Sequence, residues 1–174
     1  MKISVDLIKE LRDQTCASVA HCKKALEESG GDIKKAAVLL RKQGLEIAAK
    51  KQDRAVKEGR IEAYVHLGNK IGVLLEVNCE SDFVARNSDF TQFTKDLSMQ
   101  IAACNPQYIK KEDVPAEAAE AAKSKEEFYK AHCLLEQPFV KDPSITVNDY
   151  LGSIVGKLGE NIVIRRFARY KVGE

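Results

Sequence analysis

Apolar residues in the first fifty positions of the chain recur at the spacing of short helices. Intervals of three, four and seven place such residues on one face of a helix. The three stripes are Leu7, Ile8 and Leu11, then Val19, Cys22, Ala25 and Leu26, and then Ile33, Ala36, Ala37 and Leu40. Ser4 and Asp32 stand where helix N-caps are expected, and Gly30-Gly31 where a helix ends. The pattern predicts a three-helix bundle, with a break permitted at Gly44 before a further helical stretch.

Beyond residue 58 the apolar positions change to a period of two, which is typical of half-buried strands. The two stretches are Ile61, Ala63, Val65 and Leu67, and then Ile71, Val73, Leu75 and Val77. Residues 68–70 lie between them and read Gly-Asn-Lys, which indicates a hairpin turn. A last strand starts at Asn161, and its alternation is lost at residues 165–166, where a bulge would account for the change.

Helical spacing returns in two later stretches. Their stripes are Phe90, Phe93, Leu97, Ile101 and Cys104, and then Val147, Leu151, Ile154, Val155 and Leu158. Residues 115–136 are rich in Ala, Glu and Lys and predict one or two exposed helices. We therefore expect an α+β protein, with a three-helix domain at 1–52, a charged linker at 53–57, and a core at 58–174. In that core a small antiparallel sheet packs with helices.

Asp82 and Phe83 lie at a corner between a predicted strand and a predicted helix. Asn78 and Ser81 compete for backbone hydrogen bonds and so end the strand. Two interpretations follow from this position. Either Asp82 caps the next helix and Phe83 covers the end of the core, or both side chains project toward a partner.

Charge is unevenly distributed along the chain. Residues 1–57 contain 13 Lys and Arg against 8 Asp and Glu, whereas the remainder contains 15 against 18. The basic residues of this N-terminal helical part are consistent with a solvated surface. They are also consistent with an adaptor or a nucleic-acid-binding module. The chain lacks the Gly- and aromatic-rich ribonucleoprotein motif, so we expect no direct binding of nucleic acid.

Several classes of site lack their usual residues. The five cysteines are an odd number without a Cys-x-x-Cys pair, which favours free thiols. Cys16 and Cys22 with His21, or His132 with Cys133, do not supply the four ligands of a structural zinc site. The sequence has no phosphate loop and no nucleophile elbow. We expect no metal, cofactor or bound nucleotide, and no enzymatic activity in the sense of covalent chemistry.

The chain shows no apolar run near the roughly 18 residues that a membrane span requires. Its first residues, Met-Lys-Ile-Ser-Val-Asp, lack the apolar centre of a signal peptide. We expect a cytoplasmic protein without a membrane partner.

Residues 76–86 closely resemble a signature of bacterial elongation factor Ts. They read Glu-Val-Asn-Cys-Glu-Ser-Asp-Phe-Val-Ala-Arg, and the family pattern is Glu-Val-Asn-Cys-Glu-Thr-Asp-Phe-Val-Ala-Lys. Ser81 and Arg86 are the departures, and neither alters the Asp-Phe pair. Residues 11–26 resemble the second family signature through Leu-Arg at their start and Cys-Lys-Lys-Ala-Leu at their end. Here the chain departs at Cys16, at the small pair Val19-Ala20, and at His21.

Further resemblance lies in Gln-Pro-Phe-Val at residues 137–140 and in residues 159–167, so the matches run in order along nearly the whole chain. The N-terminal helices also resemble the ubiquitin-associated fold, a small domain that often serves for docking. The resemblance to the family implies a guanine-nucleotide exchange factor for the GTPase elongation factor Tu, with this helical domain docking on the GTPase.

The family resemblance also implies roles for particular residues. Asp82 and Phe83, flanked by Ser81 and Val84, would enter the GTPase and disturb its Mg²⁺ and phosphate site. The docking residues of the helical domain would be Arg12, Val19, Ala20 and Lys23. Short members of the family with one core pair their cores, so we expect a homodimer. The alternative function is a ubiquitin-associated-like adaptor or a basic helical nucleic-acid-binding module.

Overall fold

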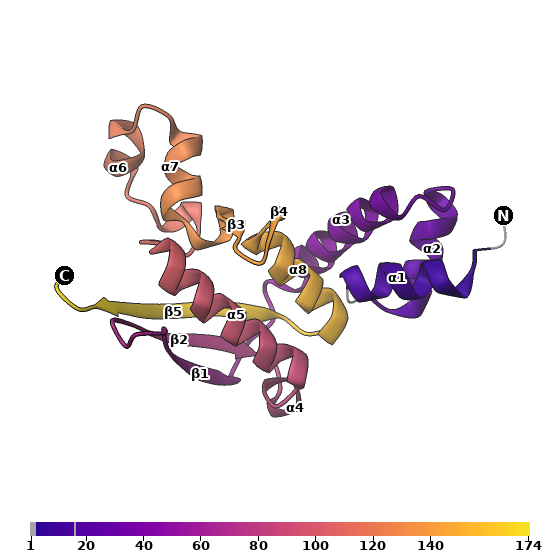
Figure 1. Cartoon of the computed structure of the whole chain (residues 1–174), viewed down its shortest axis with the longest axis horizontal. Coiled ribbons are helices and arrows are strands. Elements are labelled where there is room, and N and C mark those ends of the chain that lie inside the picture. The colour runs from indigo at the N-terminus through magenta and orange to yellow at the C-terminus, as the bar shows by residue number, and fades with distance from the viewer. Residues whose placement is uncertain (1–2, 16) are drawn as a thin grey trace. The chain divides into compact units, whose positions relative to one another are not determined.

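The computed structural model describes residues 3–15 and 17–174. In chain order the elements within these residues are α1 (Val5–Thr15), α2 (Val19–Glu28), α3 (Ile33–Lys51), β1 (Glu58–Val65), β2 (Ile71–Cys79), α4 (Asp82–Ala85), α5 (Ser88–Cys104), η1 (Lys111–Asp113), α6 (Ala116–Ala121), α7 (Lys125–His132), η2 (Leu134–Glu136), β3 (Pro138–Phe139), β4 (Asp142–Thr146), α8 (Val147–Leu158) and β5 (Ile162–Lys171). Helices are combined with a small antiparallel sheet, so the predicted α+β class is confirmed (Figure 1).

The chain divides into two compact units. The first comprises Met1–Arg54 and Leu151–Asn161, and the second comprises Ala55–Tyr150 and Ile162–Glu174. Most of α8 therefore groups with the N-terminal helices, although the predicted core range of 58–174 includes it. The predicted domain boundaries describe which segments fold on their own, and compactness does not test that. They stay a prediction.

In the first unit, α1, α2 and α3 form the predicted bundle. Its apolar core consists of Leu11, Cys22, Ala25, Leu26, Ala36 and Leu40. The predicted caps are confirmed, because the amide of Leu7 donates to Ser4 Oγ at 3.2 Å and the amide of Lys35 donates to Asp32 Oδ1 at 3.0 Å. Gly31, with φ +86°, closes α2 by donating its amide to the carbonyl at residue 26 at 2.8 Å.

The permitted break at Gly44 does not occur, since α3 is continuous from Ile33 to Lys51. Gly44 is buried, and a Cβ added to it would lie 3.0 Å from the carbonyl oxygen of Gly152 in α8. Glycine is needed here for a close approach of two backbones rather than for ending the helix. Lys51 also donates a hydrogen bond to the carbonyl of Gly159, which ties the end of α8 to the end of α3.

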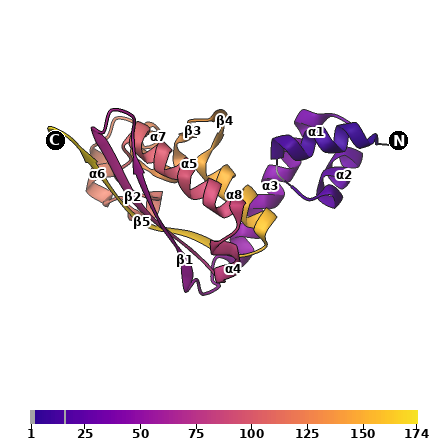
Figure 2. The same cartoon turned by 60° about the horizontal axis from the view of Figure 1, so that its bottom comes forward.

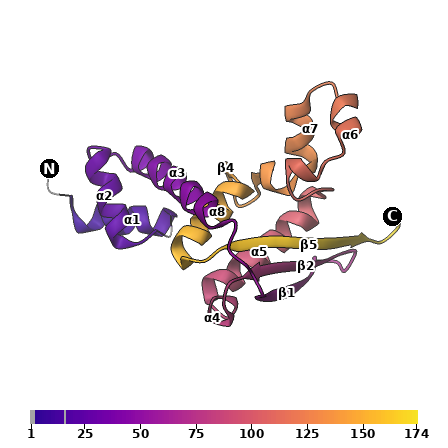
Figure 3. The ribbon, with the colours of Figure 1, turned by 180° about the vertical axis from the view of Figure 1, so that it is seen from behind.

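In the second unit, β2 is the central strand of the sheet and lies between β1 and β5. Helix α5 covers one face of this sheet (Figures 2 and 3). The large apolar side chains buried between β2 and α5 include Val73, Leu75, Val77, Cys79, Phe90, Phe93, Leu97 and Ile101, each at most 3% exposed. The alternation predicted for β2 is therefore confirmed, and so is the stripe of α5 as far as Ile101. Cys104, its last predicted member, is exposed at the end of the helix.

The bulge expected near residues 165–166 is present in the pairing of β2 with β5. Glu76 pairs with Arg166 and Val77 pairs with Ile164, so Arg165 has no opposite residue in the ladder. Ile162 and Ile164, before the bulge, are buried opposite Cys79 and Val77, and the extra residue shifts the phase so that Phe167 lies opposite Leu75 on the same face.

Strand β1 turns its polar side chains, rather than its apolar ones, toward α5. Glu62 is 8% exposed, accepts a hydrogen bond from Thr94 Oγ1 at 3.0 Å, and forms an ion pair with Arg60 at 2.9 Å. Ile61 and Val65 are left on the opposite face of the sheet, 67% and 63% exposed. The ion pair and the Thr94 hydroxyl satisfy the buried carboxylate, which is what allows this orientation.

Residues 115–136 form two helices, α6 and α7, which stand away from the sheet as a short hairpin (Figures 1 and 3). Only Ala119 in α6 is buried among the residues of these two helices. None of the helices within residues 3–15 and 17–174 combines the length and the apolar character that a bilayer crossing requires.

Candidate functional site

A short exposed turn follows the central strand of the sheet. Helix α4 has only four residues, none of them buried, and Ser81 is its N-cap. Ser81 Oγ accepts a hydrogen bond from the amide of Val84 at 3.4 Å, and the Ser81 carbonyl accepts one from Cys79 Sγ at 3.1 Å. The end of β2 therefore fixes where α4 begins.

Phe83 projects from this turn and is 83% exposed. It does not cover the end of the core, and the cap of α4 is Ser81 instead of Asp82. The first of the two interpretations of this corner is therefore wrong. The Phe83 side chain is therefore accessible to a partner rather than part of the core.

Asp82 forms an ion pair with Arg86, one of the two residues of this segment that depart from the family pattern. Arg86 Nη2 lies 2.6 Å from Asp82 Oδ2, and the two side chains are 79% and 43% exposed. Their spacing of four residues is the one at which opposite charges meet on a helix, so the sequence contained this signal. The ion pair spans the whole of α4 and adjoins Phe83.

The predicted docking residues of the first unit all lie on its surface. Arg12 is in the last turn of α1, and Val19, Ala20 and Lys23 are in α2. Val19 is 53% exposed. Lys23 forms a 3.9 Å ion pair with Glu27 one turn further along the helix.

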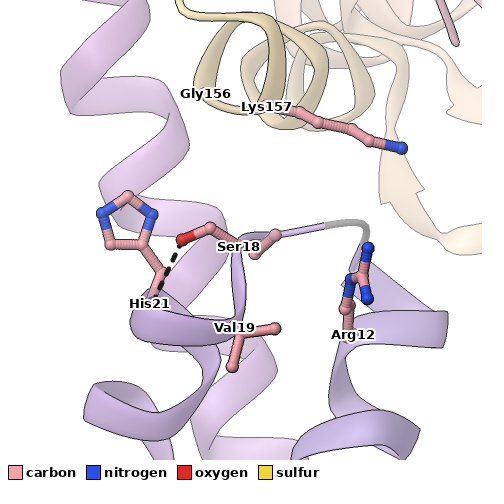
Figure 4. Close-up of a pocket in the computed structure, with 7 residues that line it drawn as sticks. Arg12, Ser18, Val19, His21, Gly156 and Lys157 are labelled. Carbon is pink, nitrogen blue, oxygen red and sulfur yellow. Dashed lines mark hydrogen bonds between the residues drawn. The ribbon is translucent and has the colours of Figure 1, made fainter.

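Two of these four residues border a pocket of about 330 Å³ (Figure 4). Its lining consists of Arg12, Ala17, Ser18, Val19, His21, Gly156 and Lys157. Arg12 and Val19 are thus brought together, whereas Ala20 and Lys23 do not line the pocket. Gly156 and Lys157 come from α8, and no local pattern in the sequence connects them with residues so distant along the chain.

Within the described residues no group of three or more His, Cys, Asp or Glu side chains is arranged to hold a metal ion. Cys16, considered above as a ligand, lies outside the described residues. Burial raises the pKa of the Cys22, Cys104 and Cys133 thiols, so these groups stay protonated near neutral pH. A protonated thiol is a poor nucleophile and a poor metal ligand.

Two findings concern a segment that relatives have and this chain lacks. Alignments with relatives extend over 195 positions or more, against the 174 residues of the chain. The family model matches in two parts that meet at residues 124–126, at the start of α7. The relatives therefore have additional residues inside the matched region, and the α6–α7 hairpin is where the match divides.

The family model for elongation factor Ts matches residues 1–126 and 124–174. The chain is 50% identical to elongation factor Ts of Caldanaerobacter subterraneus subsp. tengcongensis, over 99% of this chain and 98% of the relative. It is 47% identical to that of Thermodesulfovibrio yellowstonii, over 100% and 98%, and 48% identical to that of Thermoanaerobacter sp. (strain X514), over 99% and 96%. These matches confirm the resemblance seen in the sequence, and the chain belongs to the elongation factor Ts family of translation elongation factors.

Proposed function

We propose that this protein is a guanine-nucleotide exchange factor that binds elongation factor Tu in its GDP form and promotes release of GDP. The observation that carries the proposal is the exposure of Phe83, 83% accessible on a turn that contributes nothing to the core. Membership of the elongation factor Ts family supports it. The protein would act on the conformation of its partner and would carry out no covalent chemistry itself.

The physical requirement for exchange is a difference in affinity. A GTPase holds GDP through backbone amides of its phosphate loop and through Mg²⁺. A partner protein shifts that equilibrium only if it binds the nucleotide-free form more tightly than the GDP form. Phe83 is a rigid wedge that can occupy space between elements of the GTPase, and the Asp82 carboxylate beside it repels phosphate and accepts partner hydrogen bonds. Together they would disturb the Mg²⁺ and phosphate site.

Docking would be shared by the first unit. Arg12, Val19, Ala20 and Lys23 lie on its exposed surface and combine two cations with two small apolar side chains. Such a surface suits an acidic, partly apolar patch on the GTPase. This contact would supply binding energy, while the wedge at α4 would supply the difference between nucleotide states.

The direct test is release of fluorescent GDP from elongation factor Tu, followed with and without the full-length protein. Acceleration at substoichiometric concentrations supports exchange, and no acceleration excludes it. A salt titration of binding distinguishes the alternative function, since affinity for nucleic acid falls steeply and linearly with log salt concentration. The affinity of a protein interface built around an apolar wedge falls less as the salt concentration rises.

The pair of Asp82 and Arg86 gives a graded prediction. We expect Arg86→Ala to slow GDP release by about two- to fourfold, which is the scale of an exposed ion pair. Arg86→Lys should restore the rate, because lysine keeps the charge. In an Asp82→Asn background the loss of Arg86 should have little further effect. Additive losses in this double-mutant cycle would show that Arg86 acts independently of Asp82.

We also propose that two copies of the chain associate through the uncovered face of the sheet. Ile61, Val65, Leu74 and Tyr170 lie on the face opposite α5 and are 50–70% exposed. β2 is central, so Leu74 stands between Ala63 of β1 and Ala168 of β5. An apolar face shared by all three strands is what a two-fold interface between identical sheets would bury.

Leu74→Glu tests this interface. The substitution places two unpaired carboxylates in a two-fold interface, and we expect the dimer to weaken by about 100-fold or more. Val38→Glu is the matched control, because Val38 is 59% exposed on α3 and lies outside the sheet. Sedimentation equilibrium at micromolar concentration measures both. A wild-type mass near 19.3 kDa would exclude the dimer.

A further inference from the structure

The pocket of the first unit carries positive charge from two helices that are far apart in the sequence. Arg12 is in the last turn of α1, and Lys157 is in the last turn of α8. Both line the same pocket, and Figure 4 shows their side chains on one side of it, with His21 on the other. Among the described lining residues none is acidic. The pocket therefore attracts an anionic group.

The position of Lys157 in this unit is determined by helix packing. The backbones of α3 and α8 approach closely, since a Cβ on Gly44 would lie 3.0 Å from the Gly152 carbonyl oxygen and one on Gly152 would lie 3.2 Å from the Leu45 amide nitrogen. The bond from Lys51 to the Gly159 carbonyl holds the end of α8 two residues beyond Lys157. Lys157 is thus presented from a fixed helix end, and only its side chain needs to adjust to a ligand.

Three lysines of the first unit, all outside the pocket, form ion pairs within their own helices or caps. Lys23, Lys24 and Lys35 form ion pairs with carboxylates on their own or adjacent turns, at 3.8–3.9 Å. Arg12 forms no ion pair with a carboxylate of the described residues, and its guanidinium lies at the rim of the pocket (Figure 4). A guanidinium binds a carboxylate through two parallel hydrogen bonds.

We infer that Arg12 and Lys157 form a carboxylate-binding subsite, which takes an acidic side chain of the partner GTPase and makes Lys157 a determinant of docking. The inference rests on the proposed function. A volume of about 330 Å³ accommodates one side chain rather than a helix, and Val19 provides an apolar wall for the methylene groups of a glutamate or aspartate. The docking surface of the first unit would then include a residue from the C-terminal part of the chain.

Charge reversal of Lys157 in the full-length protein tests the inference. We expect Lys157→Glu to weaken binding to elongation factor Tu by about tenfold or more, because a desolvated charge pair at an interface becomes a repulsion. Lys42→Glu is the matched control, since it makes the same change in net charge on the exposed face of α3, away from the pocket lining. Lys42→Glu should weaken binding by less than about twofold, because it changes only the long-range electrostatic attraction between the two proteins.

Equal effects of the two reversals would overturn the inference. If Lys157→Glu alters thermal unfolding, Lys157→Gln takes its place, with an expected loss of about threefold. Loss of binding in the double variant with Arg12→Glu should be smaller than the product of the single losses, as for groups sharing one ligand. Inorganic phosphate that occupies the pocket without competing with the GTPase would contradict a carboxylate subsite. Absence of wild-type binding would instead reject the proposed function.

Discussion

Truncation of Phe83 to alanine is expected to slow GDP release from elongation factor Tu by about tenfold or more while leaving the fold intact. Phe83 is 83% exposed, so the substitution removes no packing from the core. Aromatic residues buried in the centre of an interface typically contribute about 2 kcal/mol or more, which corresponds to a rate or affinity change above tenfold. Stopped-flow release of fluorescent GDP measures the effect.

Two variants sharpen this experiment. Phe83→Leu keeps an apolar side chain of smaller volume and should retain an intermediate rate. Leu67→Ala is the matched control, because Leu67 is 92% exposed in the turn after β1 and has no proposed contact. Normal exchange by Phe83→Ala would disprove the wedge. Unfolding of that variant would contradict the exposed position of the side chain.

Gly59→Ala should produce the largest loss of stability among single substitutions in the sheet. Gly59 has φ +150°, and a Cβ at this position would lie 2.3 Å from the carbonyl oxygen of Val77 and 2.7 Å from Cα of Asn78. Both neighbours are backbone of the central strand, so the ladder itself has to move. We expect the free energy of unfolding to fall by about 3 kcal/mol, the upper range for overpacking, with backbone strain in addition.

Gly72→Ala in β2 is the control for that substitution. A Cβ at Gly72 meets no atom within 4 Å, and its φ is not in the left-handed region. Alanine there should be neutral or slightly stabilising, because it loses less conformational entropy than glycine on folding. Urea unfolding of the two variants gives the comparison. Similar midpoints for both would mean that the strand at Gly59 relaxes easily, contrary to the geometry.

Local sequence determines most of the secondary structure and the exposed turn at α4. Capping at Ser4 and Asp32 depends on side chains within three residues of the amides that they accept from. The apolar stripe of α5 and the alternation of β2 are also short-range patterns. Both are observed because the two apolar faces are buried against each other in one core. Asp82 and Phe83 are identified by the family signature at residues 76–86. The ion pair of Asp82 with Arg86 follows from their spacing of four residues on a helix.

Tertiary structure alone decides three other features, each because a neighbour distant in sequence sets the outcome. Gly44 does not break α3, since the approach of Gly152 makes glycine necessary inside the helix. The orientation of β1 is reversed because Thr94 and Arg60 satisfy a buried Glu62, and hydrophobic alternation carries no information about such partners.

The third feature is the pocket that brings Lys157 beside Arg12. Periodicity within a helix specifies which of its faces is buried, but it does not specify which other helix will cover that face. The sequence by itself therefore determined the elements, the family and the exposed turn of this protein. Helix packing and side-chain pairing decided which surface residues share one site, because those contacts join segments that local patterns cannot relate.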